Sequence, residues 1–393
     1  MPVWHDTTKQ LVADGKLVLL GVTQEQHPER CRLFAQWRGF NWPILHDPIN
    51  VLESSAVPTV VALDEFGIVR STRPNPKTFA TNFLAKTFQD DPAVRATPVR
   101  YGPTHPPAFD KLIAAANGRA AGDALTLWGG DKRLNDAIAA YKSAVKADPK
   151  DAPAWFRLGV CLRRRSELAT REPDDFHAAV AAWGTALDLN PNQYIWRRRI
   201  QQYGPRLDKP YPFYDWVTDA EAAIRERGET PVPLPVRPDG AEIAAPLRTF
   251  PTDATAAKNP DPAGKITRDK VAAVAEVVAV PARVKPGQSV RVHVTFRLKA
   301  GGKSHWNNEA DPLRVWVDPP AGGAVSARLI PADKPATATS TEVRTVGFEV
   351  KVPADATGTV RVPAFALYHV CDEVGGTCRF VRLDLTVELS VRR

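Results

Sequence analysis

The sequence predicts a multidomain protein in which an α/β part, an all-α part and an all-β part follow one another. A length of 393 residues exceeds that of one ordinary domain. Strand-like and helix-like patterns alternate in the first part, a helical repeat occupies the second, and period-two alternation marks the third. We place the parts at 1–88, 108–228 and 269–393, with Pro-rich linkers at 89–107 and 229–268.

The first part is predicted to alternate strands and helices. Residues 16–22 form an almost continuous apolar run, which is typical of a buried parallel strand. Pro28 begins a predicted helix, and a second strand is predicted over 57–63. The turn-forming residues 64–67 join that strand to a hairpin partner at 68–71.

This part resembles a known fold family. The succession LVLLGVTQE, CRLFAQW, WPILHDP and VPTVVALDEFGIVR is similar to the second half of a thioredoxin-fold redoxin of the peroxiredoxin and thiol–disulfide oxidoreductase type. In that family an apolar-Pro-Thr step carries a cis proline that faces the redox site. Val57, Pro58 and Thr59 match this step, and the resemblance implies that they bind an extended thiol substrate.

The beginning of that family's fold is missing from the sequence. Its first strand and its Cys-x-x-Cys motif do not precede this part, and we expect the chain to open inside the first helix, at Pro2, Trp4 and Leu11. We therefore expect a late start, and an oxidoreductase here only if a Cys-x-x-Cys lies upstream in the full gene product. Cys31 has no second cysteine nearby, so we expect it to be a small buried hydrophobe.

The second part contains an internal repeat. LNDAIAAYKSAVKADPKD and FHAAVAAWGTALDLNPNQ align without gaps at an offset of 42 residues. The matched positions are Ala137, Tyr141, Ala144 and Pro149 with Ala179, Trp183, Ala186 and Pro191. This pattern resembles the second helix of a tetratricopeptide unit, so we expect packed helical hairpins with flanking helices in 108–130 and 193–228. Such a region either binds a peptide or protein partner or serves as a rigid spacer, and Cys161 is expected in its core.

The third part is predicted to be a β-sandwich. Apolar and polar residues alternate over several segments, which indicates half-buried strands separated by Pro/Gly turns. The apolar positions are Val290, Val292, Val294, Phe296 and Leu298; Val346, Phe348, Val350 and Val352; and Leu383, Leu385, Val387, Leu389 and Val391.

Two cysteines near the C-terminus are the best candidates for chemistry. Cys371 and Cys378 flank Gly375 and Gly376 between two strand-like runs, so the segment is predicted to be a β-hairpin. If the turn is centred between Val374 and Gly375, the two cysteines lie opposite each other, almost close enough to bond. A short closed loop gives little entropic stabilisation, which favours a redox couple over a staple.

The cysteine segment also resembles a known domain, the N-terminal immunoglobulin-like domain of the DsbD family of thiol:disulfide interchange proteins. Tyr368, Cys371 and Cys378 match that domain's Tyr-x-x-Cys approach and cysteine pair, and GGKSHWNNEADPL is similar to a segment ahead of one of its strands. The resemblance covers about the last 125 residues. It implies that both cysteines are catalytic, that Tyr368 helps to bind the substrate, and that the partner is a DsbD-like or thioredoxin-like protein carrying a thiol or disulfide.

Two other interpretations of the cysteine pair stay open. One is a structural disulfide in a non-catalytic protein-binding scaffold. The other is a soft-metal site formed by His305, His369, Cys371 and Cys378, in which His369 and Cys371 share a strand face. Our prediction is that the protein has no cofactor and no resident metal.

Charge and hydropathy exclude some partner classes. The net charge of +8 is mild for this length, and the basic runs 163–165 and 197–199 lack interleaved aromatic residues, so we predict no nucleic-acid partner. No apolar run approaches the roughly 20 residues of a membrane helix, so no membrane span is predicted. The sequence as written shows no signal peptide and indicates the cytoplasm, whereas the domain resemblances imply an extracytoplasmic or periplasmic location.

Overall fold

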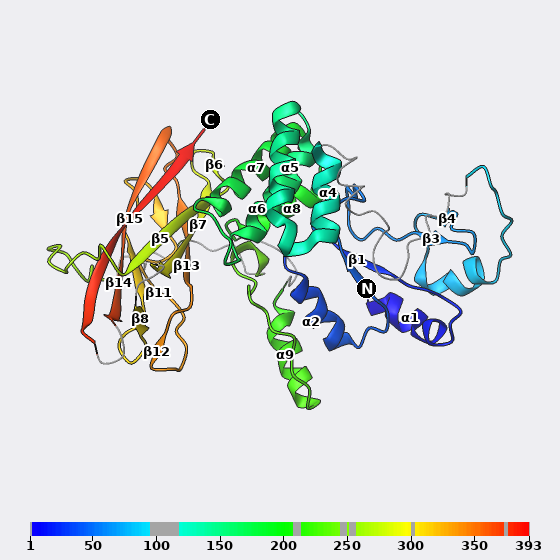
Figure 1. Cartoon of the computed structure of the whole chain (residues 1–393), viewed down its shortest axis with the longest axis horizontal. Helices are drawn as coiled ribbons and strands as arrows, with labels where there is room; N and C mark the ends of the chain where they lie inside the picture. Colours follow the sequence, from blue (N-terminus) through cyan, green and yellow to red (C-terminus); the bar gives the residue numbers. More distant parts are fainter. Residues whose placement is uncertain are drawn as a thin grey trace. The chain divides into compact units, whose positions relative to one another are not determined.

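A computed structural model describes residues 2–94, 118–206, 214–243, 250, 257–299, 303–372 and 376–392. Both helices and sheets are present, as Figure 1 shows. Contacts within the chain divide it into two compact units. The first unit contains Met1–Arg165, Thr185–Arg198 and Asp215–Arg237, and the second contains Ser166–Gly184, Arg199–Tyr214 and Pro238–Arg393.

The first unit begins with short strands and helices. Its elements are α1 (Pro2–Ala13), β1 (Gly21–Thr23), α2 (Pro28–Arg38), β2 (Ile44–His46), β3 (Ala62–Leu63), β4 (Val69–Ser71), the 3-10 helix η1 (Pro76–Thr78) and the π-helix η2 (Ala80–Leu84). β1 pairs with β2 in parallel, and β3 pairs with β4 in an antiparallel hairpin. The predicted helix at Pro28 and the predicted hairpin are therefore confirmed.

The turn of the β3–β4 hairpin is held by Asp64. Its Oδ1 atom accepts the backbone N–H groups of Phe66 and Ile68, each at 2.9 Å. Gly67 has a φ of +78°, a conformation that a side chain disfavours. The ordinary turn chemistry of Asp and Gly thus explains why the sequence located this hairpin correctly.

The strand predicted at 16–22 is shorter and less buried than its apolar sequence suggests. Only its end joins β1, and Val18 and Leu20 are 82% and 55% exposed. The strand predicted at 57–63 shrinks in the same way to β3, and Val61 is 48% exposed. The prediction of a buried strand at 16–22 is therefore wrong for Val18 and Leu20, and the strand predicted at 57–63 is confirmed only at its end.

Helices follow in the middle of the chain. They are α4 (Gly118–Gly129), the 3-10 helix η3 (Gly130–Arg133), α5 (Leu134–Ala147), α6 (Ala152–Arg165), α7 (Asp175–Leu189), α8 (Tyr194–Tyr203) and α9 (Trp216–Glu226). In the first unit, α4 packs on α5 and α5 packs on α6, while α9 packs on α2. The indole ring of Trp216 lies parallel to that of Trp37, with the ring centroids 5.9 Å apart.

The repeat marks the buried face of its helices. α5 and α7 carry the matched small and aromatic positions, and each of these side chains is at most 8% exposed. They are Ala137, Tyr141 and Ala144 on α5, and Ala179, Trp183 and Ala186 on α7. These small and aromatic side chains therefore form the buried packing face of the two helices.

The second unit contains strands and parts of two helices. Its elements include η4 (Gly240–Glu242), β5 (Ala273–Val280), β6 (Arg283–Val284), β7 (Ser289–Leu298), β8 (Ser304–Asn307), β9 (Arg314–Val317), β10 (Ala324–Val325), β11 (Leu329–Pro331), β12 (Thr339–Ser340), β13 (Arg344–Lys351), β14 (Gly358–Asp372) and β15 (Cys378–Val391). One sheet has the order β10-β13-β7-β5. The other has the order β11-β9-β14-β15-β6, and β8 joins β14 to β12.

One hydrophobic core is shared by both sheets of the second unit. Alternate residues of β7, β13, β14 and β15 point into it, as a period of two requires. Val292, Val294 and Phe296 on β7 are 0% exposed, and Phe348 on β13 is 1% exposed. The predicted alternation is therefore confirmed. Helical residues also contact this part, because the backbone oxygen of Tyr203 accepts a 2.7 Å hydrogen bond from Nε2 of His293 on β7.

A smaller cluster lies on the opposite face of β14. Trp316, Phe365 and Leu367 form it, and Ile266 packs against it. The guanidinium of Arg382 lies 3.8 Å from the centroid of the Phe365 ring. The end of the predicted linker 229–268 therefore lies against the sheet.

Candidate functional site

The two C-terminal cysteines lie at the tip of the β14–β15 hairpin. Cys371 and Cys378 are register partners, as the turn-centred argument predicts. Their sulfur atoms form a disulfide, and their Cα atoms are 4.0 Å apart. Below the tip, β14 and β15 stay paired as far as Gly358 and Val391. The disulfide therefore sits on a long antiparallel ribbon that fixes its position.

The disulfide occupies the sheet face that points away from the shared core. Side chains alternate between faces along a strand, so Cys371 lies on the same face as His369 and Leu367. Tyr368 and Val370 point the other way, into the core, and are 1% and 0% exposed.

The prediction that Tyr368 contacts substrate therefore does not fit this arrangement. Its ring packs edge-to-face against Trp306, with centroids 5.5 Å apart, and its hydroxyl donates to Oδ2 of Asp269 at 2.5 Å. Burial and the Asp269 carboxylate raise the pKa of Tyr368 far above its ordinary value. The structure does not bring this side chain to the disulfide.

The two cysteines differ in exposure. Cys371 is 3% exposed, whereas Cys378 is an exposed residue. Cys371 lies on the inner strand of three, between Cys378 on β15 and His305 on β8, and both are its register partners. The sulfur of Cys378 is therefore the more accessible of the two to a thiolate from solvent.

Polar contacts hold the hairpin tip independently of the disulfide. The carboxylate of Asp372 accepts a 2.8 Å hydrogen bond from the hydroxyl of Ser304 and a 2.9 Å ion-pair hydrogen bond from Nη2 of Arg379. The amide of Asn307 lies 3.9 Å from Sγ of Cys378. These contacts connect β8, β14 and β15 around the two sulfur atoms. Sequence reasoning missed the Asp372–Arg379 pair, for which the predicted hairpin was the only signal.

Two histidines lie on the disulfide's face of the sheet. The His369 ring stacks on its register partner Phe380, with ring centroids 4.6 Å apart. Burial, assisted by Arg314 and opposed by Asp311, lowers the pKa of His369, so this imidazole is neutral at neutral pH. His305 is distant in sequence, and its place beside Cys371 follows from the pairing of β8 with β14.

The structure does not offer the cysteine ligands that the soft-metal interpretation needs. Both cysteines are joined in a disulfide and are not thiolates, which metal binding requires. Within the part of the chain that the structure describes, no group of three or more His, Cys, Asp and Glu side chains is placed to hold a metal ion. His305, His369, Cys371 and Cys378 share a sheet face without forming such a group.

The remaining predicted site residues belong to the first unit. The peptide bond between Val57 and Pro58 is cis, and Val57 is 56% exposed. The hydroxyl of Thr59 donates a 2.9 Å hydrogen bond to the backbone oxygen of Ala56. These residues lie in a different unit from the disulfide, so the structure describes them as a separate exposed segment.

The free thiols are poorly suited to exchange. Burial raises the pKa of Cys31 to about 11, although a hydrogen bond with Thr23 opposes the shift. Burial raises the pKa of Cys161 to about 12, and this residue is 1% exposed, as predicted for a core position. Cys31 is partly buried, so the expectation of a small buried hydrophobe holds for it only in part. Neither thiol ionises appreciably at neutral pH.

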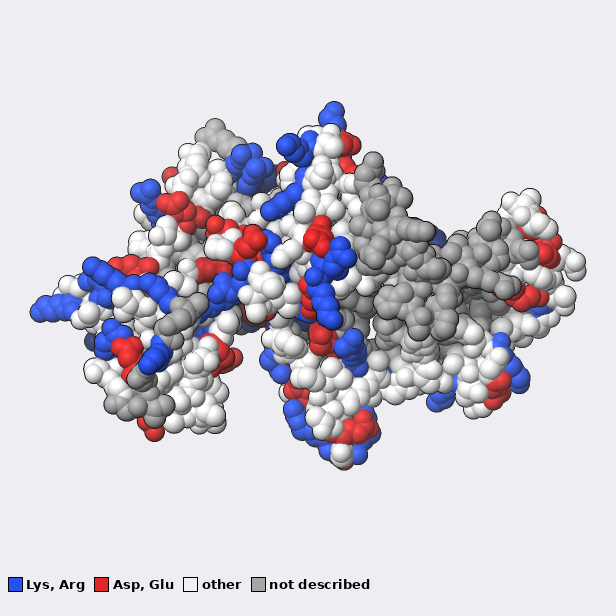
Figure 2. Space-filling model, viewed as in Figure 1, with Lys and Arg blue, Asp and Glu red and all other residues white. Residues whose placement is uncertain are grey.

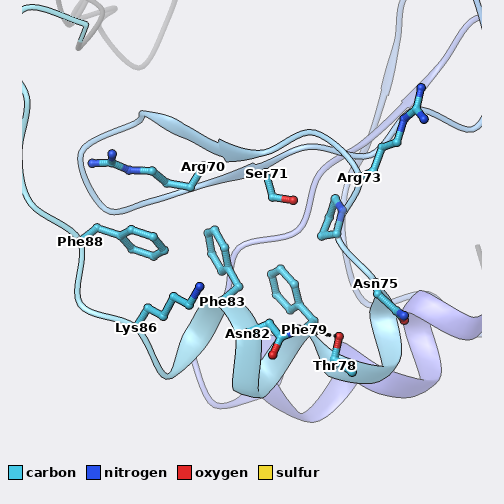
Figure 3. Close-up of a pocket in the computed structure, with 11 residues that line it drawn as sticks. Arg70, Ser71, Arg73, Asn75, Thr78, Phe79, Asn82, Phe83, Lys86 and Phe88 are labelled. Atoms are coloured by element: carbon cyan, nitrogen blue, oxygen red, sulfur yellow. Dashed lines mark hydrogen bonds between the residues drawn. The ribbon is translucent and has the colours of Figure 1, made fainter.

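A pocket of about 310 Å³ lies beside η1 and η2 in the first unit. Its rings belong to Phe79, Phe83 and Phe88, and Figure 3 shows Arg73 directed away from them. Arg70 is bound to Oδ2 of Asp64 at 2.6 Å, so its charge is already compensated. The cations of this pocket do not converge on a common point, and it ranks below the disulfide as a candidate site.

Surface charge and helix length are relevant to the predictions about nucleic acid and membranes. On the face drawn in Figure 2, Lys and Arg side chains are interspersed with Asp and Glu. No helix among the described residues has both the length and the apolar character that crossing a membrane would require.

Comparison with known proteins adds little. No family model and no curated protein matches the chain. Solved structures similar in part include the GAE domain of yeast GGA1, with 8% identity and a TM-score of 0.19 over 31% of this chain and 97% of that one. AvmM, which catalyses macrocyclisation in alchivemycin A biosynthesis, has 13% identity and a TM-score of 0.20 over 32% and 92%. The sporulation control protein Spo0M of Bacillus subtilis has 12% identity and a TM-score of 0.18 over 32% and 51%. Likenesses this weak carry no functional argument.

Proposed function

We propose that this chain is a thiol–disulfide exchange protein whose redox couple is the Cys371–Cys378 disulfide. The observation that carries the proposal is the unequal exposure of the two cysteines, because Cys378 is exposed and Cys371 is 3% exposed. An incoming thiolate therefore has one defined point of attack and one defined leaving group. The proposal assigns a DsbD-type immunoglobulin-like sandwich to 269–393, tetratricopeptide-like hairpins to 108–228 and a thioredoxin-like fold to 1–88.

The reaction proceeds through a mixed disulfide. A thiolate of the reduced partner attacks Sγ of Cys378, the bond between the two cysteines breaks, and Cys371 leaves as a thiolate that takes up a proton. The partner's second thiol, as a thiolate, then attacks the partner sulfur and releases Cys378, which is protonated in turn. The partner's two thiols are oxidised to a disulfide, and Cys371 and Cys378 are reduced to two thiols. The reverse sequence oxidises the pair again.

The surroundings of the pair support reversible cycling. The contacts of Asp372 with Ser304 and Arg379 do not involve the sulfur atoms, so they persist when the disulfide opens. The ribbon of β14 and β15 continues from the tip to Gly358 and Val391. Reduction therefore breaks one covalent bond without removing the frame that holds both sulfurs.

The helical part has a role in partner binding within this proposal. α4, α5 and α6 pack as neighbouring helices, and Trp128 at the end of α4 is 55% exposed. In this proposal the helices bind a peptide segment of the thiol-carrying partner and so keep the partner bound to the chain. An extracytoplasmic location goes with the proposal, because disulfides persist in oxidising compartments.

Electron transfer to the pair tests the proposed function. The oxidised full chain is mixed with a reduced dithiol protein of the thioredoxin class, the reaction is quenched with acid, and free thiols are counted by alkylation and mass spectrometry. We expect two new thiols, at Cys371 and Cys378, in the native protein. A Cys31→Ser/Cys161→Ser variant is the matched control and should react equally, because neither thiol takes part. No transfer to the native chain would contradict the proposal.

A non-catalytic scaffold with a structural disulfide is the second candidate. The burial of Cys371 and the polar contacts of the tip favour it, because both also suit a bond that only closes a hairpin. This function predicts a disulfide that survives millimolar reduced glutathione in the folded protein, with partner binding unaffected by Cys371→Ser/Cys378→Ser. A pair that is readily reduced in the native state excludes it.

A further inference from the structure

Among the described residues, the edge of β15 next to the disulfide has backbone groups without a hydrogen-bond partner. β15 pairs with β14 along one side. On its other side, the N–H of Arg382 donates to the oxygen of Thr267 at 2.9 Å, and the oxygen of Arg382 accepts the N–H of Asp269 at 2.7 Å. The backbone groups of Arg382 therefore point away from β14, toward the outer edge of the sheet.

The alternation of an antiparallel pair extends this orientation to the tip. Successive residues of a strand bond alternately to one neighbour and to the other, so Phe380 and Cys378 share the outward orientation of Arg382. Among the described residues, none bonds to the backbone N–H or oxygen of Phe380 or Cys378 on that side. Phe380 is 38% exposed, and Cys378 is exposed as well.

The chain itself shows that this edge accepts an extended segment. Residues 267–269 lie along β15 at Arg382 and make a parallel bridge there through Arg268. That segment covers the edge at Arg382 and leaves the two outward-facing residues nearer the tip open. Charged side chains often protect an edge strand from pairing with another strand. Arg379 is the charged residue nearest this part of the edge, and its guanidinium is bound to Asp372 on the neighbouring strand β14.

We propose that the thiol-bearing segment of the exchange partner binds as an added strand on the β15 edge at Cys378 and Phe380. This inference rests on the proposed function and names its mode of substrate recognition. An extended segment paired with these two residues carries its own side chains alongside Sγ of Cys378, where the attacking thiolate is needed. Recognition through the backbone accepts many partner sequences, because the ladder bonds do not involve side chains.

Peptide thiols test the added strand directly. One probe is a short blocked peptide with a single cysteine among valine and threonine residues, and the other is the same peptide with N-methyl groups on alternate backbone amides. Methylation removes the donors that pair with the edge and leaves the thiol in place. Reaction of each with the oxidised full chain is followed as mixed-disulfide formation, and dithiothreitol serves as a probe that forms no strand. We expect the unmethylated peptide to react roughly five- to tenfold faster than the methylated one.

Proline substitutions locate the effect on the edge. Phe380→Pro removes an outward N–H next to the disulfide and should abolish the difference between the two peptides. Thr386→Pro removes an outward N–H farther along the same strand and should keep the difference, which controls for strand distortion by proline.

The outcomes separate this inference from the proposed function. If dithiothreitol fails to reduce the native pair, the proposed function fails. If dithiothreitol reduces it and the two peptides react equally, the added strand alone is overturned. A dimer that sedimentation detects in the parent chain and that Phe380→Pro dissociates would also overturn it, because a second copy would then occupy the edge.

Discussion

The hydroxyl of Tyr368 donates a 2.5 Å hydrogen bond to Oδ2 of Asp269, and this bond joins β14 to the residues that precede β5. The Asp269 carboxylate also accepts the backbone N–H groups of residues 271–273. Tyr368 lies three residues before Cys371 but on the other face of the sheet. Tyr368 therefore stabilises the sheet that carries the disulfide.

Tyr368→Phe should destabilise the second unit and leave the redox pair intact. The substitution keeps the ring and removes one donor from a buried carboxylate, which costs about 1–3 kcal/mol in free energy of unfolding. Urea denaturation of the oxidised protein measures this loss. Asp269→Asn should cost a similar amount, and the two changes together should cost less than their sum, because they remove the same bond. Additive losses would show that the two side chains act separately.

Acid should weaken the second unit through Asp269. Burial raises the pKa of this carboxyl, but the backbone N–H of Ala272, the Tyr368 hydroxyl and further N–H groups outweigh it, so the pKa lies below its ordinary value of 3.8. A lowered folded pKa means that the unfolded chain binds more protons. Its contribution to stability is therefore complete above the ordinary pKa and is lost as the pH falls through the folded pKa.

Asp269→Asn tests this pH dependence. The free energy of unfolding of the parent chain, measured between about pH 6 and pH 3, should fall more steeply than that of the variant. Parallel curves would show that Asp269 is not among the groups that titrate on acid unfolding.

Single serine substitutions should reveal which sulfur is accessible. In the Cys371→Ser variant the remaining Cys378 is exposed, so it should react rapidly with an aromatic disulfide reagent and form a mixed disulfide. In Cys378→Ser the remaining Cys371 is buried, and its reaction should be at least about tenfold slower. Background from Cys31 and Cys161 is subtracted with the Cys371→Ser/Cys378→Ser protein. Equal rates for the two single variants would remove the asymmetry on which the proposed function depends.

Two helical glycines should respond in opposite ways to alanine. A Cβ at Gly122 on α4 would lie 2.5 Å from Cε1 of Tyr141, whose ring is fully buried and whose hydroxyl is bound to Asp123. Gly122→Ala should therefore cost about 1–3 kcal/mol through overpacking. A Cβ at Gly184 on α7 meets nothing within 4 Å, so Gly184→Ala should be neutral or stabilise the helix by up to about 1 kcal/mol. Thermal unfolding of both variants checks the contrast.

Local chemistry explains what the sequence could predict. The hairpin at Asp64 and Gly67, the helix at Pro28 and the strand faces of the third part follow from turn residues, proline and period-two alternation. The pairing of Cys371 with Cys378 follows from counting residues about the centre of a turn. Each of these predictions concerns residues that are close together in the chain.

Features that depend on contacts between distant parts of the chain could not be predicted from the sequence. An apolar run at 16–22 looks like a buried strand whether or not a covering element is present, and Val18 is 82% exposed in this structure. The resemblance to the DsbD-type domain implied that Tyr368 binds substrate near Cys371, yet a step of three positions along a strand reverses the face on which a side chain lies. The neighbourhood of His305 and the open edge at Phe380 depend on which strands pair, and that order has no local signal.

The reduction potential of the Cys371–Cys378 couple tests the central claim most directly. The folded full chain is equilibrated in buffers of defined thiol–disulfide ratio, and the fraction of reduced pair is read by alkylation and mass spectrometry. An exchange protein should show a midpoint between about −270 and −120 mV, the range of proteins that trade disulfides with partners. A midpoint below about −300 mV, typical of structural disulfides, would contradict the redox assignment and leave a stapled scaffold.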